Sequence, residues 1–261
     1  MNRAMLAIIR KDLQSVTANK RLFLPLLLVP LVMTVVVPSI LMAALLLSPD
    51  DPDLQGLLSQ LPRELAGGNP SLALGKMMFN TILPAFFLMI PIMTASIMAG
   101  SSFVGEKERH TLETLLYCPI TLRQIFRAKV LAAFFLSMAV SLGSFLVMCL
   151  VLETEAVLLL GSLLPPGANW LVTLFLLAPA VSLVAVTLIV RGSAKAKSVE
   201  ESQQRAMFLV IPVVLLIVGQ FSGAMLLNVW ILLALAAVCA LLAVLLFHRA
   251  LRRFTYERVL E

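Results

Sequence analysis

The sequence predicts an all-α integral membrane protein with six transmembrane helices. Of its 261 residues, 61% are hydrophobic and only 13% are charged, whereas soluble domains are roughly half apolar and a quarter charged. A soluble fold of this size could not bury so much apolar surface in one core. The apolar residues form long runs separated by short basic segments, which is typical of membrane spans joined by loops.

The spans and their orientation follow from length and charge. A transmembrane helix needs about 20 apolar residues, and six segments approach or exceed this: 22–47, 77–101, 130–152, 170–190, 207–227 and 229–247. Of the 20 Lys and Arg residues, 18 lie before the first span, in alternate loops and after the last span. The positive-inside rule places these segments in the cytoplasm. We therefore expect residues 1–261 to form one multi-pass domain of the cell membrane with both termini cytoplasmic.

The basic residues are dispersed in loops at one membrane face, so the net charge of +6 does not indicate nucleic-acid binding. The other face carries acids in its two longer loops, among them Asp50 and Glu153. We expect membrane lipid, and no nucleic acid, to contact this chain.

Residues 1–21 are predicted to form an amphipathic helix that lies flat on the inner membrane surface. Apolar residues such as Val16 fall on one side at helical spacing, basic residues on another, and Asp12 lies at the apolar edge. An ordinary basic tail is the alternative. The candidate membrane-interface residues are Met5, Leu6, Ile9, Arg10, Lys11 and Leu13.

The loop after the second span is the most informative segment. Residues 104–118 are predicted to form a helix in which Arg109 can pair with acids three or four positions away. Three leucines, at 112, 115 and 116, form a small apolar ridge with a charged rim, which is typical of a docking surface. A solvated, salt-bridged surface helix is the alternative.

A second helix is expected to begin directly after that loop. Pro119 ends the first helix, and Thr121 with Gln124 has the spacing of a capping box. We expect the basic residues that follow, Arg123, Arg127 and Lys129, to meet the lipid headgroups before the third span.

This loop resembles the signature of type-2 permeases of ABC transporters. The order of parts agrees along nearly the whole chain, although His110 stands where family members usually have glycine. The resemblance implies that 104–118 is the coupling helix, which seats in a groove of the ATP-binding subunit. The implied ATPase-coupling residues are Glu106, Glu108, Arg109, Thr111, Leu112, Glu113, Leu115 and Leu116.

The resemblance also implies the partners and the cofactors. Two permease chains would pair, either as a homodimer or with a sister permease, and two cytosolic ATP-binding cassette subunits would bind beneath them. Substrate would move outward between the permeases. ATP and Mg would be bound by the ATPase subunits, and this chain would bind no cofactor.

No ATPase motif is present in this chain, so it is not expected to be an enzyme. The nearest approach to a P-loop ends at Gly75, Lys76 and Met77, where the glycine spacing is wrong and Met77 replaces the required Ser or Thr. By the charge count, that stretch also lies outside the cell. No metal-binding cluster or nucleophile triad is recognisable.

Two other functions remain open. Glu200, Glu201 and Arg205 match a Glu-Glu-x-x-x-Arg pattern of membrane-embedded proteases, but neither histidine lies where it could meet Glu200 in the bilayer. A secondary transporter or channel would be expected to carry ionisable residues at mid-membrane, and these spans have none there. The possible pathway-lining residues are Asn80, Thr94, Ser96, Gln220, Ser222 and Asn228.

Overall fold

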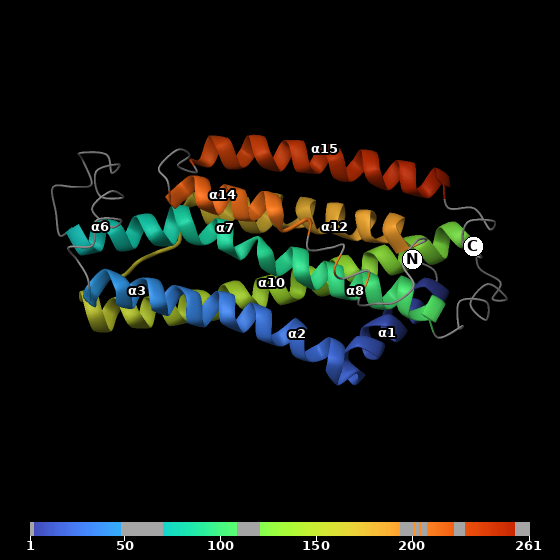
Figure 1. Ribbon diagram of the computed structural model, residues 1–261, viewed down its shortest axis with the longest axis horizontal. Coiled ribbons are helices and arrows are strands. Elements are labelled where there is room, and N and C mark those ends of the chain that lie inside the picture. The colour runs from blue at the N-terminus through green and yellow to red at the C-terminus, as the bar shows by residue number, and fades with distance from the viewer. Residues whose placement is uncertain are drawn as a thin grey trace.

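The computed structural model is a bundle of long helices lying side by side (Figure 1). It describes residues 3–47, 70–108, 121–193, 201, 204, 208–221 and 228–253. All regular elements in these ranges are helical. The described chain starts at Arg3 and finishes at Arg253 at the same end of the bundle (Figure 1).

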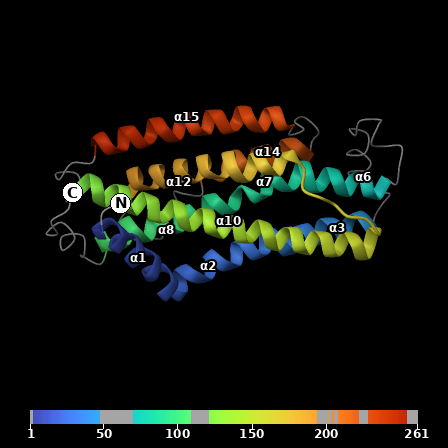
Figure 2. The ribbon, with the colours of Figure 1, turned by 180° about the vertical axis from the view of Figure 1, so that it is seen from behind.

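The first part of the chain forms a short helix followed by a long, bent one. Asn19 separates them, because its extended backbone ends α1 and its side chain accepts a hydrogen bond from the Arg21 N–H. Seen from behind, α1 lies beside the first part of α10, and α2 leads from α1 toward the middle of that helix (Figure 2). The elements are α1 (Arg3–Ala18), α2 (Lys20–Leu31), η1 (Val32–Val36) and α3 (Val37–Leu47).

Two further helical stretches extend well past the predicted spans 77–101 and 130–152. The first consists of α6 (Pro70–Met77), η2 (Met78–Ile82), α7 (Leu83–Phe87) and α8 (Met89–Glu108), and the second is α10 (Leu122–Leu160). At 1.5 Å per residue, the 39 residues of α10 exceed the roughly 30 Å of the hydrocarbon core. Glu153, predicted to lie in an outer loop, therefore belongs to this helix.

The capping box predicted at the start of α10 is confirmed. Thr121 accepts a hydrogen bond from the Gln124 N–H, and the Gln124 side chain accepts one from the Thr121 N–H. At the other end, Gly161 adopts φ 62°, a left-handed conformation that suits glycine at a helix C-terminus.

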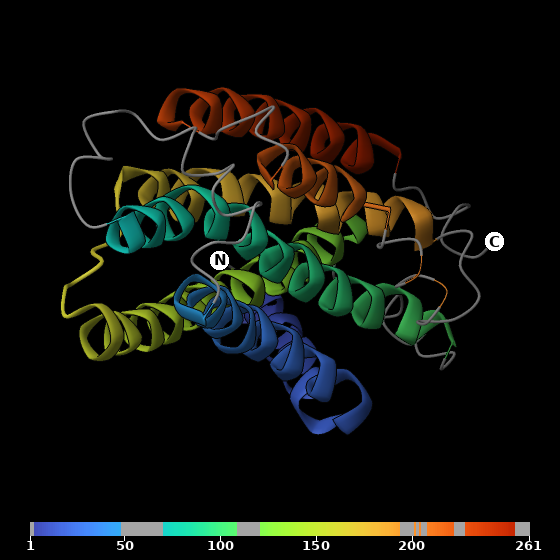
Figure 3. The same cartoon turned by 60° about the vertical axis from the view of Figure 1, so that its left-hand side comes forward.

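The last part of the chain packs on the opposite side of the bundle. Its elements are α11 (Ala168–Val172), η3 (Thr173–Leu177), α12 (Ala178–Ser193), α14 (Ile211–Phe221) and α15 (Val229–Arg253). Figure 3 shows α7 and α8 running between the α2–α3 side and the α12–α15 side. Burial agrees: 83% of the most apolar stretch of the α6–α8 span is buried, against 17% for α15.

Five helical stretches among the described residues are long and apolar enough to cross a membrane. The predicted span 207–227 is described only over 208–221, where α14 is an apolar helix of 11 residues. The proposed turn or re-entrant hairpin at 219–228 includes residues outside the described ranges. The six-span count therefore remains a prediction, whereas the all-helical membrane architecture agrees with the sequence.

Three widened, π-helical turns interrupt the bundle, and each ends two residues before a proline. The pairs are η1 with Pro38, η2 with Pro84 and η3 with Pro179. Proline lacks an N–H, and its ring clashes with the carbonyl four residues earlier, so the preceding turn widens. The helices α10 and α15 contain no proline and run without such a turn.

Candidate functional site

Four charged side chains meet beneath α1, at the end of the bundle from which the predicted coupling segment leaves. Lys11 and Asp12 come from α1, Glu106 from the last turn of α8, and Lys129 from the second turn of α10. Lys129, Asp12 and Glu106 are only 1%, 2% and 7% exposed. We call these four residues the basal charge cluster.

Lys129 is the centre of this cluster. Its Nζ lies 2.8 Å from Glu106 Oε2 and 3.5 Å from Asp12 Oδ2. It also donates to the Ser102 carbonyl oxygen at 2.6 Å and lies 3.0 Å from Ser102 Oγ, which in turn donates to Asp12 Oδ2 at 2.5 Å. The Phe103 ring covers the same ammonium group at 5.3 Å from its centroid.

The four residues of the basal charge cluster supply two cations and two carboxylates. Lys11 completes it by pairing with Glu106 Oε1 from the partly exposed side. Isolated charges in a low-dielectric interior are strongly disfavoured, whereas mutually hydrogen-bonded charges can be retained there. Because the four residues come from three helices, their pairing ties α1 to α8 and α10.

The placement of α1 differs in part from the flat helix on lipid that the sequence predicts. Ile9 and Val16 are buried, and so are Ile8 and Asp12, which the predicted apolar face did not include. This side of α1 packs on α10, α2 and α8. Met5 and Leu13 are half-buried, whereas Leu6, Arg10 and Lys11 remain exposed.

The prediction for Lys129 was wrong. Arg123 and Arg127 are exposed, as expected of headgroup contacts, but Lys129 points into the bundle. A basic side chain so close to the start of an apolar run can take one of two positions. It can lie at the bundle surface among the lipid headgroups, or it can lie inside the bundle and pair with a carboxylate. The one sequence signal for the second was Asp12, an acid out of place on the apolar edge of α1.

The predicted coupling segment is only partly described. Residues 104–108 continue α8 and are not the start of a separate helix. Glu106, predicted to pair with Arg109, contacts Lys11 and Lys129 in the cluster. Glu108 ends α8, and the other coupling residues lie outside the described residues: Arg109, Thr111, Leu112, Glu113, Leu115 and Leu116.

Two of the possible pathway-lining residues bind backbone at η2. Pro84 has no N–H to offer the carbonyl of Asn80, four residues earlier. That carbonyl accepts a hydrogen bond from Asn169 Nδ2 at 2.7 Å. The carbonyl of Phe79 accepts one from Trp170 Nε1 at 3.0 Å. The carbonyl of Thr81 accepts one from Gln220 Nε2 at 2.7 Å. The Asn80 side chain accepts from the Gly167 N–H.

The other possible pathway-lining residues are scattered. Thr94 is buried and hydrogen-bonds Ser137 and the Ile90 carbonyl, so it joins α8 to α10. Ser96 is buried with no hydrogen-bond partner among the described residues. Asn228 is exposed at the start of α15, and Ser222 lies outside the described residues. Of the members of this set that the structure describes, Thr94 and Ser96 lie on α8, and Asn228 precedes α15.

The long apolar helices define the class of the protein: a multi-pass helical membrane protein. Residues 67–200, just over half of the chain, match the family described as ABC-2 family transporter protein. The chain belongs to this family, whose members are the membrane-spanning permease components of ABC transporters and work with separate ATP-binding cassette subunits. Comparison with curated proteins finds no match.

Proposed function

We propose that this permease is the membrane-spanning subunit of an ATP-driven exporter. A second permease chain, identical or a sister protein, pairs with it, and two cytosolic ATPase subunits bind at the end of the bundle that holds the basal charge cluster. The chain crosses the membrane six times with both termini in the cytoplasm. ATP and Mg are held by the ATPase subunits.

The observation that supports this most directly is the basal charge cluster. The predicted coupling helix, 104–118, begins within the last turns of α8, which ends at Glu108, and is followed by α10, which begins at Leu122. Glu106 lies two residues before the end of α8, and Lys129 lies seven residues after the start of α10. The two side chains are paired with each other and with α1. A force on the coupling segment therefore acts on three helices together.

The energetic requirement of this mechanism is modest. The permease needs two arrangements of its helices that differ in affinity for the ATP-bound ATPase pair, and ATP binding then shifts the population between them. Kinks at the prolines of spans one, two and four provide places where helices can bend. Among the described residues, the buried charges Asp12, Glu106 and Lys129 lie at one end of the bundle, which favours an external energy source over ion coupling.

The leucines of the predicted coupling helix provide the test. The double variant Leu112→Asp with Leu116→Asp should still insert and fold but should no longer retain an ABC ATPase when tagged permease is purified from native membranes. Aspartates would replace the apolar contacts that anchor such an interface, where single residues can contribute 2 kcal/mol or more, or about 30-fold in affinity.

Leu158→Asp is the matched control, because this leucine is 77% exposed near the opposite end of α10. It should leave ATPase recovery, measured by quantitative mass spectrometry of the P-loop subunit, unchanged. Equal recovery with the double variant and the wild type would contradict the assignment of this segment, as would labelling of a tag at Arg109 from outside intact cells.

A further inference from the structure

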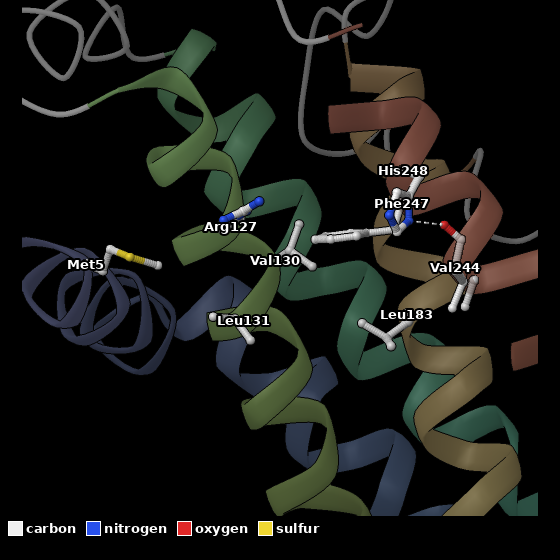
Figure 4. A pocket seen from close by; sticks show the side chains of 9 residues that line it. Met5, Arg127, Val130, Leu131, Leu183, Val244, Phe247 and His248 are labelled. Atoms are coloured by element: carbon white, nitrogen blue, oxygen red, sulfur yellow. Dashed lines mark hydrogen bonds between the residues drawn. The ribbon is translucent and has the colours of Figure 1, made fainter. Parts of the chain in front are cut away.

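A pocket of about 430 Å³ opens between α10 and α15, near the end of the bundle that holds the basal charge cluster (Figure 4). Both helices pack on α12, whose Leu183 lies between them, and Met5 of α1 contributes from the side. Pockets that hold small ligands typically have volumes of about 300–1,000 Å³. The size alone is therefore sufficient for part of a lipid or drug-sized molecule.

The pocket changes character along the helix axes. On α10, Arg127 lies one turn nearer the end of the bundle than Leu131; on α15, His248 lies one turn nearer the end than Val244. One turn of helix rises 5.4 Å. The pocket thus has cationic and polar groups at its outer rim and aliphatic groups deeper in the bundle.

The deep part of the pocket is apolar. In Figure 4 the Phe247 ring extends from α15 toward α10, and its centroid is 5.9 Å from that of Phe126. Val244 remains 55% exposed at the edge, so the pocket is open sideways to the surroundings of the bundle. In a bilayer, those surroundings are acyl chains. Acyl chains make no hydrogen bonds, so they can pack against the apolar side chains that line this part of the pocket.

The rim of the pocket has an available positive charge. Arg127 is exposed, and it has no carboxylate partner among the described residues. Two buried acids near this end of the bundle, Asp12 and Glu106, are already paired with Lys129 and Lys11. His248 donates its Nδ1–H to the Val244 carbonyl at 3.1 Å, so its Nε2 donates to a phosphate only when the ring is protonated.

From this arrangement we infer that the pocket is a binding site for an anionic phospholipid of the leaflet nearest the basal charge cluster. The phosphate binds Arg127, with His248 beside it, and one acyl chain occupies the slot formed by Leu131, Leu183 and Phe247. Basic pockets between transmembrane helices are suited to anionic headgroups, and each basic residue near the surface contributes about fivefold in affinity. The site contacts α1, α10, α12 and α15, so a bound lipid joins elements from both sides of the bundle.

Native mass spectrometry of the purified full-length permease, titrated with phosphatidylglycerol or phosphatidylcholine, tests this inference. The wild-type chain should bind phosphatidylglycerol more tightly than phosphatidylcholine. Arg127→Gln should weaken phosphatidylglycerol binding about fivefold and leave phosphatidylcholine binding nearly unchanged.

Arg123→Gln is the matched control, since Arg123 is an exposed arginine one turn earlier on α10 that does not line the pocket. It should retain wild-type affinity. Ala243→Phe, which fills the slot, should weaken binding of both lipids and tests the acyl-chain part independently. Equal binding of the two lipids by the wild type, or equal losses in the two arginine variants, would overturn the inference and indicate lipid bound at the general protein surface.

Discussion

Lys129→Met is expected to destabilise the folded permease by about 3–5 kcal/mol, because it removes one partner of a buried ion pair. Among the described residues, Asp12 and Glu106, 2% and 7% exposed, would keep Lys11 as their cationic partner. Ser102 would also lose its hydrogen bonds to the ammonium group. The measurement is thermal unfolding of the purified chain in detergent, followed by far-ultraviolet circular dichroism.

Lys11→Met is the matched control, since it removes the same charge from the same cluster. The Lys11 side chain is 52% exposed, so its loss should cost about 1 kcal/mol or less. Adding Asp12→Asn to Lys129→Met restores charge balance and should recover much of the stability. If Lys129→Met is no more destabilising than Lys11→Met, the buried ion pairs of Lys129 stabilise the fold no more than the partly exposed pair of Lys11.

The second large effect is expected at Trp170, which is 1% exposed at the opposite end of the bundle. Its ring centroid lies 5.2–5.6 Å from those of Phe79, Phe87 and Phe145. Trp170→Ala leaves a cavity among these rings and should cost about 3 kcal/mol or more. Trp170→Phe retains an aromatic ring but leaves the Phe79 carbonyl without its donor, at a cost of about 1–2 kcal/mol.

The other tryptophan supplies the comparison for this experiment. Trp230 is 76% exposed on α15, and Trp230→Phe should change stability by no more than about 0.5 kcal/mol. The same unfolding measurement, in the same detergent, compares Trp170→Ala, Trp170→Phe and Trp230→Phe. A Trp170→Phe protein as stable as the Trp230→Phe protein would show that the hydrogen bond at η2 contributes nothing.

Much of the fold could be predicted because its signals are local. Apolar runs of span length predict the long helices, and the spacing of Thr121 and Gln124 predicts where α10 begins. The family also follows from a local signature, the charged loop after the second span, and the match over residues 67–200 agrees.

The side-chain partners could not be predicted, because they depend on which helix lies opposite. Lys129 pairs with residues 117 and 23 positions earlier, Asp12 and Glu106, and no periodicity within one segment identifies such a pair. Asn80 and Gln220 were interpreted as polar lining of a pathway. Their role at η2 depends on carbonyls that become available only when Pro84 widens the preceding turn.

The π-helical turns also alter how each span must be read. A widened turn holds one more residue than an ordinary turn, and one residue corresponds to a rotation of about 100°. A helical wheel that begins at the start of the first span therefore assigns the residues after Val36 to the wrong face of the helix. The same geometry gives η1, η2 and η3 a spare residue each, so a single-residue deletion there can be absorbed by closing the turn, whereas within α10 it would turn every later side chain away from its neighbours.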